Sequence, residues 1–408
     1  MRNSYDVVVV GGGIAGSALA ARLARDGVRV LVLERTTEYV DRVRGEAMMP
    51  WGVVELKRLG LYDTLIQAGG IHSDRWVQFW EGRPAEEAEA SPIPVGQVLP
   101  DAAPLNIGHP TACAALNDAA VAAGAEVVRG ASDVQLIEDP RGVSYVAGQV
   151  ARNVTARMVV GADGRTSIVR EQAGVTLDRQ DPPNMVTGLL VEPETPLPDY
   201  DIIAAEGNFA MLSFLQPGGR ARVYALPPPD QRDRFTGREG GSKLLEALRL
   251  DCLPMADALA NGRAVGPCAT YPGDESWTAH PFSNGVVLIG DAAGYNNPII
   301  GQGLSLAMRD VRLVSDVLLS TPEWTTEMFR PYGEERLERM RRVRFSADLL
   351  AATLVQITSP EGRFEAQVRR LSDPVMFQGL LTVLTGPEAA PAEAFSDEAF
   401  RDVVAAAG

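Results

Sequence analysis

The sequence has little of several features that mark whole classes of protein. It contains three cysteines in 408 residues, Cys113, Cys252 and Cys268, and no two of them form a C-x-x-C motif. Cysteines so few and so far apart give no disulfide framework, and we expect free thiols in a reducing cytoplasm. No apolar run approaches the roughly 20 residues that cross a bilayer, so we expect no integral membrane segment.

The chain also lacks an excess of positive charge. Lys and Arg number 38 against 53 Asp and Glu, and the formal net charge is −15 at pH 7. Nucleic-acid-binding proteins usually present a basic face, so we expect no nucleic-acid partner and no attraction to anionic membranes. The one basic cluster, Arg336 to Arg344, has glutamates beside it and is interpreted as a solvated helical face. No Ser/His/Asp arrangement and no metal-ligand spacing is visible, so no metal site is predicted.

What is present begins with the N-terminal stretch VVVVGGGIAGSALAARLARDGVRVLVLER, residues 7–35. Three consecutive glycines interrupt its apolar run, which argues against a signal peptide or a membrane anchor. The pattern instead predicts a buried strand over residues 7–10, a turn, and a helix from Ile14 to Asp26 that ends at Gly27. A second strand then runs to Leu33.

The glycines of this unit fit a cradle for a dinucleotide. Gly11 allows a tight turn, Gly13 lets the backbone approach a pyrophosphate, and Gly16 lets the helix pack closely on the strand. The second strand delivers Glu34, 18 residues after Gly16, where a carboxylate can bind ribose hydroxyls. The strand, turn, helix, strand and acid together predict dinucleotide binding far more strongly than a lone G-x-G-x-x-G.

Two further apolar strands end in a glycine and an acid. They are MVVGADGRTSIVR, with Asp163 and Gly164, and GVVLIGDAAGYNNPIIGQG, with Gly290 and Asp291. Doubly wound sheets bind their ligands at the carboxyl ends of the strands, where a carboxylate can accept hydrogen bonds from sugar or ribityl hydroxyls. Either pair alone is typical of an ordinary turn, but their order after the cradle indicates one shared site.

Between these motifs the character of the chain changes. NMVTGLLVE, NFAMLSFLQ and RARVYALP predict short, mostly antiparallel strands. Residues 208–216 and 222–226 are expected to form the floor of a substrate pocket, and register decides which side chains face it. The candidates are Trp80, Phe209, Met211, Phe214 and Tyr224. A long helical region, residues 303–355 with a break near Pro322, follows.

These motifs resemble those of the single-component (group A) FAD-dependent monooxygenases with the p-hydroxybenzoate hydroxylase fold. DGRTSIVR matches a family segment that is linked to both FAD and NAD(P)H, and GDAAGYNNPIIGQG matches the segment that wraps the flavin. The turn before Leu304 opens a long helix, whose N-terminal dipole would face the flavin. Asp291 would hold the ribityl chain. The resemblance implies these cofactor-binding residues: Gly11, Gly13, Ala15, Gly16, Glu34, Arg35, Arg44, Asp163, Gly164, Asp291, Pro298, Gly301, Gln302 and Gly303.

The resemblance also implies the architecture. We expect an α/β protein with a Rossmann-like FAD-binding domain, an inserted and mostly antiparallel β-sheet substrate domain, and a helical C-terminal region. The FAD-binding domain would comprise residues 1–74, 105–180 and 276–321. The substrate domain would comprise residues 75–104 and 181–275, and the helical region residues 322–408.

The implied activity is that of a cytoplasmic monooxygenase with non-covalent FAD and NADPH or NADH as co-substrate. Reduced flavin would react with O2, and the flavin hydroperoxide would hydroxylate or epoxidise an apolar or aromatic small molecule. No catalytic base is predicted.

Two departures from the family pattern leave alternatives open. Gly294 follows GDAA where many members have histidine, and GDAAG also resembles flavin reductases that saturate isoprenoid chains. A reductase or dehydrogenase of an apolar chain therefore remains an alternative, as does a flavin-binding protein without turnover. His109 stands where the family usually has an arginine near the FAD phosphates, and it is either a FAD contact or a surface or capping residue.

Overall fold

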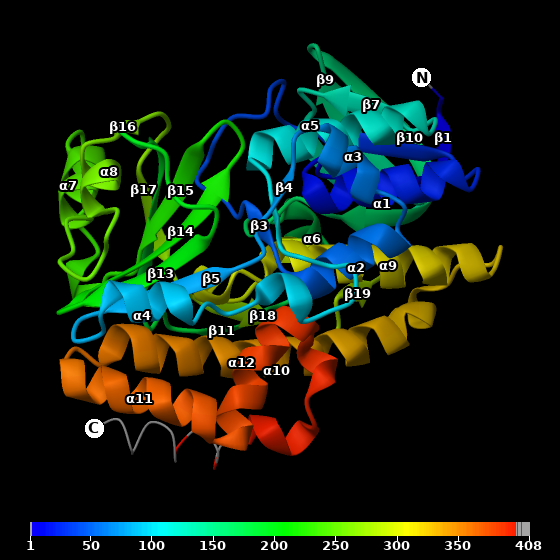
Figure 1. The fold of residues 1–408 in the computed structure, drawn as a ribbon. Coiled ribbons are helices and arrows are strands. Elements are labelled where there is room, and N and C mark those ends of the chain that lie inside the picture. Colours follow the sequence, from blue (N-terminus) through cyan, green and yellow to red (C-terminus); the bar gives the residue numbers. More distant parts are fainter. Residues whose placement is uncertain (1, 397, 399–400, 402–408) are drawn as a thin grey trace.

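A mixed eight-stranded sheet organises the N-terminal part of the chain (Figure 1). The computed structural model describes residues 2–396, 398 and 401. Five parallel strands have the order β20-β10-β1-β2-β7, with β19 antiparallel at one edge. β1 is an almost unbroken run of valines, as expected for a strand covered on both faces. The strand bounds are β1 (Ser4–Val10), β2 (Val30–Glu34), β7 (Glu126–Arg129), β10 (Val150–Gly161), β19 (Phe282–Ser283) and β20 (Val286–Leu288).

Helices pack on this sheet and form the largest core. α1 follows β1, as predicted, and Gly27 lies beyond its end with φ +81°. α2 and α9 pack closely at Gly52 and Ser305. A Cβ on Gly52 would lie 2.2 Å from Ser305 Oγ, so the close contact depends on this glycine. The helix bounds are α1 (Ile14–Arg25), α2 (Pro50–Arg58), α3 (Tyr62–Gln67), α5 (His109–Ala122), α6 (Ile168–Gln172) and α9 (Gly303–Ser320).

The predicted meander between residues 134 and 160 is present. β8 (Ser132–Ile137), β9 (Gly142–Ala147) and the first half of β10 pair in antiparallel order. The second half of β10 continues into the parallel sheet beside β1. One long strand therefore carries the chain from the meander to the DGR motif at the carboxyl edge of the sheet.

A second sheet, mostly green in Figure 1 with β5 in light blue, holds the strands predicted for the substrate domain. Its order is β16-β12-β15-β14-β13-β5, with β17 also paired to β12, and all pairs but β5–β13 are antiparallel. α7 (Gly240–Ala247) and α8 (Ala256–Ala260) pack against its outer face. The strand bounds are β5 (Trp76–Trp80), β12 (Met185–Glu192), β13 (Asp201–Glu206), β14 (Phe209–Gln216), β15 (Arg220–Ala225), β16 (Arg263–Ala264) and β17 (Ala269–Pro272).

Small elements link the two sheets. A three-stranded ribbon has the order β3-β6-β4, and β11 pairs with β18. A helix within the predicted substrate domain, α4, was not expected from the sequence. The bounds are β3 (Ala47–Met48), β4 (Ile71–His72), β6 (Leu105–Asn106), β11 (Asp178–Gln180), β18 (Glu275–Trp277) and α4 (Ala85–Ala90).

The C-terminal helices lie along one side of both sheets, orange to red in Figure 1. α10 (Arg330–Ala351) continues into a π-helical segment, Ala352–Gln356, and is followed by α11 (Pro360–Ser372) and α12 (Pro374–Thr385). In the described part of the chain, none of the helices has the length and apolarity that crossing a membrane requires.

The interpretation of Arg336 to Arg344 as a solvated face is wrong. Arg336 and Arg339 in α10 are 1% and 2% exposed, and both bind the buried carboxylate of Asp310 in α9. The charge pattern within α10 could not reveal this, because the partner that makes burial tolerable comes from another helix. Buried charges of this kind persist when they are paired.

The predicted fold class is confirmed: a Rossmann-like sheet, a mostly antiparallel second sheet and a helical C-terminal region are all present. The domain boundaries at the stated residues stay a prediction. Part of the predicted C-terminal region, residues 397, 399–400 and 402–408, lies outside the described residues. Cys113, Cys252 and Cys268 are free, as expected.

Candidate functional site

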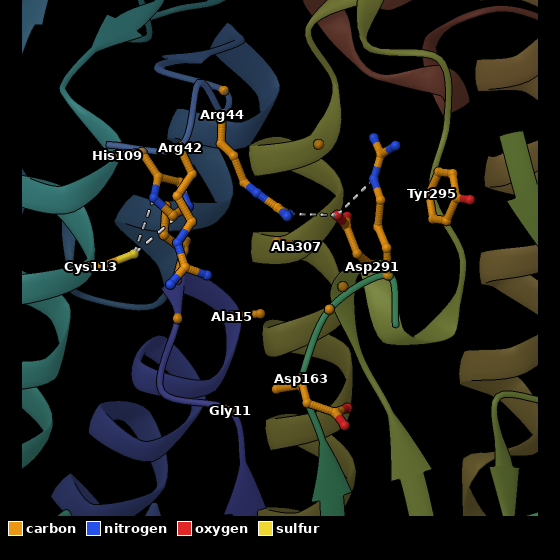
Figure 2. A pocket seen from close by; sticks show the side chains of 18 of the residues that line it. Gly11, Ala15, Arg42, Arg44, His109, Cys113, Asp163, Asp291, Tyr295 and Ala307 are labelled. Carbon is orange, nitrogen blue, oxygen red and sulfur yellow. Dashed lines mark hydrogen bonds and ion pairs between the residues drawn. The ribbon is translucent and has the colours of Figure 1, made fainter. Parts of the chain in front are cut away.

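One cavity of about 790 Å³ lies where the first sheet, α1, α5 and α9 meet the inner face of the second sheet (Figure 2). The predicted cofactor residues converge on it although they are spread from residue 11 to residue 303. Two of them do not line it, Gly16 and Gln302. Those that do are Gly11, Gly13, Ala15, Glu34, Arg35, Arg44, Asp163, Gly164, Asp291, Pro298, Gly301 and Gly303.

The three glycines of the first turn, Gly11, Gly13 and Gly16, have different structural roles. Gly11 has φ +103°, and a Cβ there would lie 2.3 Å from Ala162 O. A Cβ on Gly16 would lie 1.9 Å from Gly11 O, so this glycine lets α1 pack on the turn. A Cβ on Gly13 would meet nothing within 4 Å, and Gly13 faces the cavity. Gly11 and Gly16 therefore shape the turn, and Gly13 leaves open space over the N-terminus of α1.

Glu34 closes this cradle from the end of β2. Its Oε2 accepts a hydrogen bond from Gly12 N–H at 2.7 Å, and its Oε1 accepts from the Thr36 N–H and hydroxyl at 2.8 and 2.7 Å. The Tyr39 hydroxyl donates to Gly12 O from the other side. The carboxylate is fixed at the cavity wall by these bonds. Oε2 accepts one hydrogen bond and can accept a second, so the predicted ribose contact remains chemically open.

Asp163 has a structural role that the sequence did not reveal. Its Oδ2 accepts hydrogen bonds from the N–H groups of Ile168 and Val169 at 2.8 and 3.2 Å, and Oδ1 accepts from the Ser167 hydroxyl. The carboxylate therefore satisfies N–H groups at the start of α6. In Figure 2 Asp163 lies apart from the ion pairs higher in the cavity. Its predicted bond to a sugar hydroxyl stays a prediction.

Asp291 lies between two arginines. Arg44 Nη1 is 3.9 Å from its Oδ2 and Arg165 Nε is 3.6 Å from the same oxygen (Figure 2). Arg165 also stacks 4.1 Å from the centroid of the Tyr295 ring. These pairs are long and partly exposed, so they contribute little stability and leave the Arg44 guanidinium able to bind an anion. Arg165 has a second carboxylate nearby, since its Nη1 is 3.5 Å from Asp274 Oδ1. The sequence singled out Arg44 and Asp291 but missed Arg165, which directly follows the DG pair.

The N-terminus of α9 opens into the cavity beside Pro298. Gly301 has φ +62°, and no side chain caps the first turn of the helix. Gln302 is turned away: its Oε1 accepts from Trp51 Nε1 at 2.8 Å, and its Nε2 donates to Ile300 O and Val383 O. The glutamine thus attaches the helix start to α2 and α12. The uncapped N–H groups and the positive end of the helix dipole are left for a ligand.

His109 belongs to the cavity wall and not to the outer surface. Its ring lies beside Cys113, with Nδ1 3.6 Å from Sγ, and near Arg42 and Arg44 (Figure 2). Burial and, to a lesser extent, the charge of Arg44 together lower the pKa of His109 to about 4. The imidazole is therefore neutral at neutral pH. It can replace the family arginine as a hydrogen-bonding group but not as a charge.

The second sheet supplies an apolar wall. On β14, Leu212 and Phe214 face the cavity, whereas Phe209 and Met211 point to the opposite face and its separate core. Of the five candidates named from the sequence, Phe214 and Tyr224 line the cavity. Register made this choice, as expected for a period of two. The other apolar wall residues of this sheet are Val186, Leu226 and the ring of Tyr271.

One polar cluster interrupts that wall, and the sequence did not predict it. Glu46 and Tyr224 line the cavity, and the Tyr224 hydroxyl donates to Glu46 Oε2. Arg222 Nη2 is 3.1 Å from Glu46 Oε1 and 2.6 Å from Asp41 Oδ2. Burial raises the pKa of Glu46 to about 7, against the opposing effect of the Arg222 charge. Arg222 and Tyr224 are two residues apart on one strand, and this spacing was the only sign in the sequence that they share a face of the sheet.

Comparison with known proteins connects this cavity to a cofactor. The family model described as the FAD binding domain matches residues 4–346. Squalene monooxygenase of Mus musculus is 26% identical over 388 residues, which cover 90% of this chain and 64% of that protein. This chain therefore spans less than two thirds of that relative's length.

Solved structures share the fold. PqsL from Pseudomonas aeruginosa superposes with a TM-score of 0.73 at 21% identity, covering 89% of this chain and all of that one. The p-nitrophenol 4-monooxygenase PnpA from Pseudomonas putida DLL-E4 has a TM-score of 0.71 at 21% identity, covering 100% of this chain and 99% of that one. The two-sheet fold is thus shared with these structures.

Proposed function

Because the chain belongs to the FAD binding domain family, we propose that it is a FAD-dependent monooxygenase. It uses NADPH or NADH and O2 to hydroxylate or epoxidise an apolar or aromatic small molecule. One observation carries the proposal: a single cavity joins the glycine cradle of the first sheet to the apolar face of the second. The monooxygenase relative from mouse supports the reaction class.

The residues of the cavity fit FAD. Two uncapped helix N-termini, those of α1 and α9, open into the same space, and both suit negative charge. The open side of Gly13 admits the pyrophosphate, and Glu34 would bind the ribose next to it. Asp291 would hold the ribityl chain, while Arg44, whose nitrogen is 3.9 Å from Asp291, is able to turn toward a phosphate.

FAD, when bound, accepts a hydride and activates O2. The chain's own part is to place an organic substrate beside the flavin and to keep water away. Leu212, Phe214 and Leu226 on the second sheet offer the apolar surface for this, and Pro298 borders the same space. Positive potential at the start of α9 would stabilise the negative charge that reduced flavin carries.

Gly294 gives the reductase alternative no support. Its φ is +113°, and a Cβ at this position would lie 2.5 Å from Ser276 O and 2.9 Å from Trp277 Cα. The backbone itself therefore requires glycine after GDAA, whatever reaction the flavin performs. The histidine of other family members is absent here for a steric reason.

The proposal is tested with the FAD-loaded protein. We expect NADPH or NADH to bleach the flavin absorbance without O2, and O2 to restore it. A substrate should accelerate nicotinamide oxidation and divert O2 from hydrogen peroxide to product. Bound FAD that neither nicotinamide reduces would contradict the proposal and favour a flavin-binding protein without turnover.

A further inference from the structure

A buried carboxyl group lies behind the loop that borders the cavity next to α9. Glu275 on β18 is 0% exposed, and its Oε1 accepts a hydrogen bond from the Asn297 N–H at 3.0 Å. Its Oε2 is buried and has no hydrogen-bond partner in the described part of the chain. Asn297 directly precedes Pro298, which lines the cavity, whereas Glu275 does not line it. The carboxyl group therefore supports the cavity wall from behind.

Asn297 is the point at which this loop is attached to the rest of the fold. Its Nδ2 donates to Asn184 Oδ1 at 2.7 Å, and its Oδ1 accepts from the Ile299 N–H at 3.1 Å. Asn184 directly precedes β12, whose Val186 lines the same cavity. Both asparagines are 0% exposed. Asn297 thus connects the Pro298 turn to the second sheet through its side chain and to β18 through its backbone.

The backbone beside Asn297 leaves the Glu275 carboxyl group a specific task. Ser276 and Tyr295 pair through two backbone hydrogen bonds, at 2.8 and 2.9 Å, which hold the start of the loop against β18. The Asn297 N–H lies two residues further along and is bound by the Glu275 side chain instead. A buried N–H group that loses its acceptor keeps the cost of leaving water, so the loop would shift toward another partner.

The Glu275 carboxyl group is largely neutral at pH 7. Burial and, to a lesser extent, the nearby charge of Asp348 raise the pKa of Glu275 to about 8. Asp274 acts in the same direction, whereas the Asn297 hydrogen bond and the charge of Arg344 oppose it. A neutral carboxyl group accepts the N–H through its carbonyl oxygen, and the side-chain amide of glutamine has the same acceptor.

We propose that Glu275 is a positioning residue for the flavin site. By binding the Asn297 N–H it fixes Pro298 beside the flavin, at the turn that precedes the N-terminus of α9. The residue touches neither substrate nor cofactor and acts through the loop alone. This inference rests on the proposed function, because it places the flavin in the same cavity.

Two variants separate the acceptor from the rest of the side chain. Glu275→Gln keeps an oxygen for the Asn297 N–H, whereas Glu275→Met has a similar length and no such acceptor. Hydrogen exchange of the peptide that contains residues 295–300 is measured by mass spectrometry in the cofactor-free protein. We expect exchange at least about tenfold faster than in the wild type for Glu275→Met, and within about twofold of it for Glu275→Gln. If Glu275→Met does not fold, Glu275→Asp, whose carboxyl group is one methylene short of Asn297, replaces it with the same expectation.

The same variants are titrated with FAD, and the visible circular dichroism of the bound flavin is recorded. Glu275→Met should bind FAD at least about fivefold more weakly, because the loop must first be ordered again. It should also change the flavin dichroism, since Pro298 is no longer held in place. Glu275→Gln should match the wild type in both measurements.

Glu206→Met is the matched control. Glu206 Oε2 also accepts a hydrogen bond from a backbone N–H, that of Cys252 at 2.8 Å, and neither residue lines the cavity. This variant should leave the loop exchange, the FAD affinity and the flavin dichroism unchanged.

Three results would overturn the inference: unchanged loop exchange in Glu275→Met, an equal change in Glu275→Gln, or an equal change in Glu206→Met. Each of them leaves the proposed function intact, because other contacts would then hold the loop beside the flavin. The expected changes in exchange and dichroism, without an oxygenated product from any compound, would instead refute the proposed function alone.

Discussion

Replacing Arg336 by methionine should loosen the flavin site from a distance. Arg336 Nη1 and Nη2 donate to three carbonyl oxygens of the turn formed by residues 290–294, at 2.8–3.1 Å. Its Nε is 3.1 Å from Asp310 Oδ2, and the same oxygen accepts from Gly290 N–H at 2.8 Å. One guanidinium therefore holds both ends of the turn that presents Asp291 to the cavity.

The magnitude follows from burial. Breaking a fully buried ion pair typically costs about 3–5 kcal/mol of unfolding free energy. Asp310 keeps Arg339 at 2.8 Å, which reduces the electrostatic loss, but three carbonyls lose a donor at the same time. We therefore predict a loss of about 3–5 kcal/mol for Arg336→Met. FAD should also bind at least about tenfold more weakly, because Asp291 is no longer held in place.

Urea unfolding of the cofactor-free protein and a FAD titration measure the two effects. Arg330→Met is the control: its partner is Glu327, and the side chains are 66% and 71% exposed. An exposed pair contributes about 0–1 kcal/mol, so this variant should match the wild type in both assays. The reasoning fails if Arg336→Met is no less stable than Arg330→Met, or if it binds FAD as tightly.

Three further predictions concern the cavity and its supports. Gly13→Ala should keep its unfolding free energy within about 1 kcal/mol of the wild type, because a Cβ there meets nothing, yet FAD titration should show at least about tenfold weaker binding. Gly52→Ala should lower the free energy of unfolding in urea by about 1–3 kcal/mol, since its Cβ would lie 2.2 Å from Ser305 Oγ. Glu46 binds its proton more tightly in the fold, where its pKa is about 7, than in the unfolded chain, so its stabilising effect is complete below about pH 4.5 and is lost as the pH rises to about 7. Glu46→Gln should remove this loss, and urea unfolding at pH 5 and pH 8 should show the variant gaining up to about 3 kcal/mol on the wild type.

Local patterns predicted the fold because each depends on short-range chemistry. The valines before Gly11 predicted a doubly covered strand, and the apolar segment of residues 208–216 predicted a strand of the second sheet. Both strands are present, and the face of the second became known only with its register. Phe214 lines the cavity and Phe209 does not, although the sequence treats them alike.

The polar networks could not be predicted, because their members come from distant segments. The sequence predicted a solvated Arg336, but α9 places the buried carboxylate of Asp310 beside it. Glu46 is one glutamate among many in the sequence, and its partners on β15 lie more than 170 residues further along the chain. Asp163 was expected to bind a sugar hydroxyl, and the geometry shows that it first serves the backbone of α6.

The central claim, that this chain transfers oxygen with FAD, is tested most directly by isotope labelling. The FAD-loaded protein is supplied with NADPH and NADH, 18O2 and a set of apolar and aromatic compounds, and the products are analysed by mass spectrometry. The account predicts one 18O atom in each molecule of product, formed with one molecule of nicotinamide oxidised. Nicotinamide oxidation that yields a product with two added hydrogens and no 18O, or only labelled hydrogen peroxide with every compound, would contradict it.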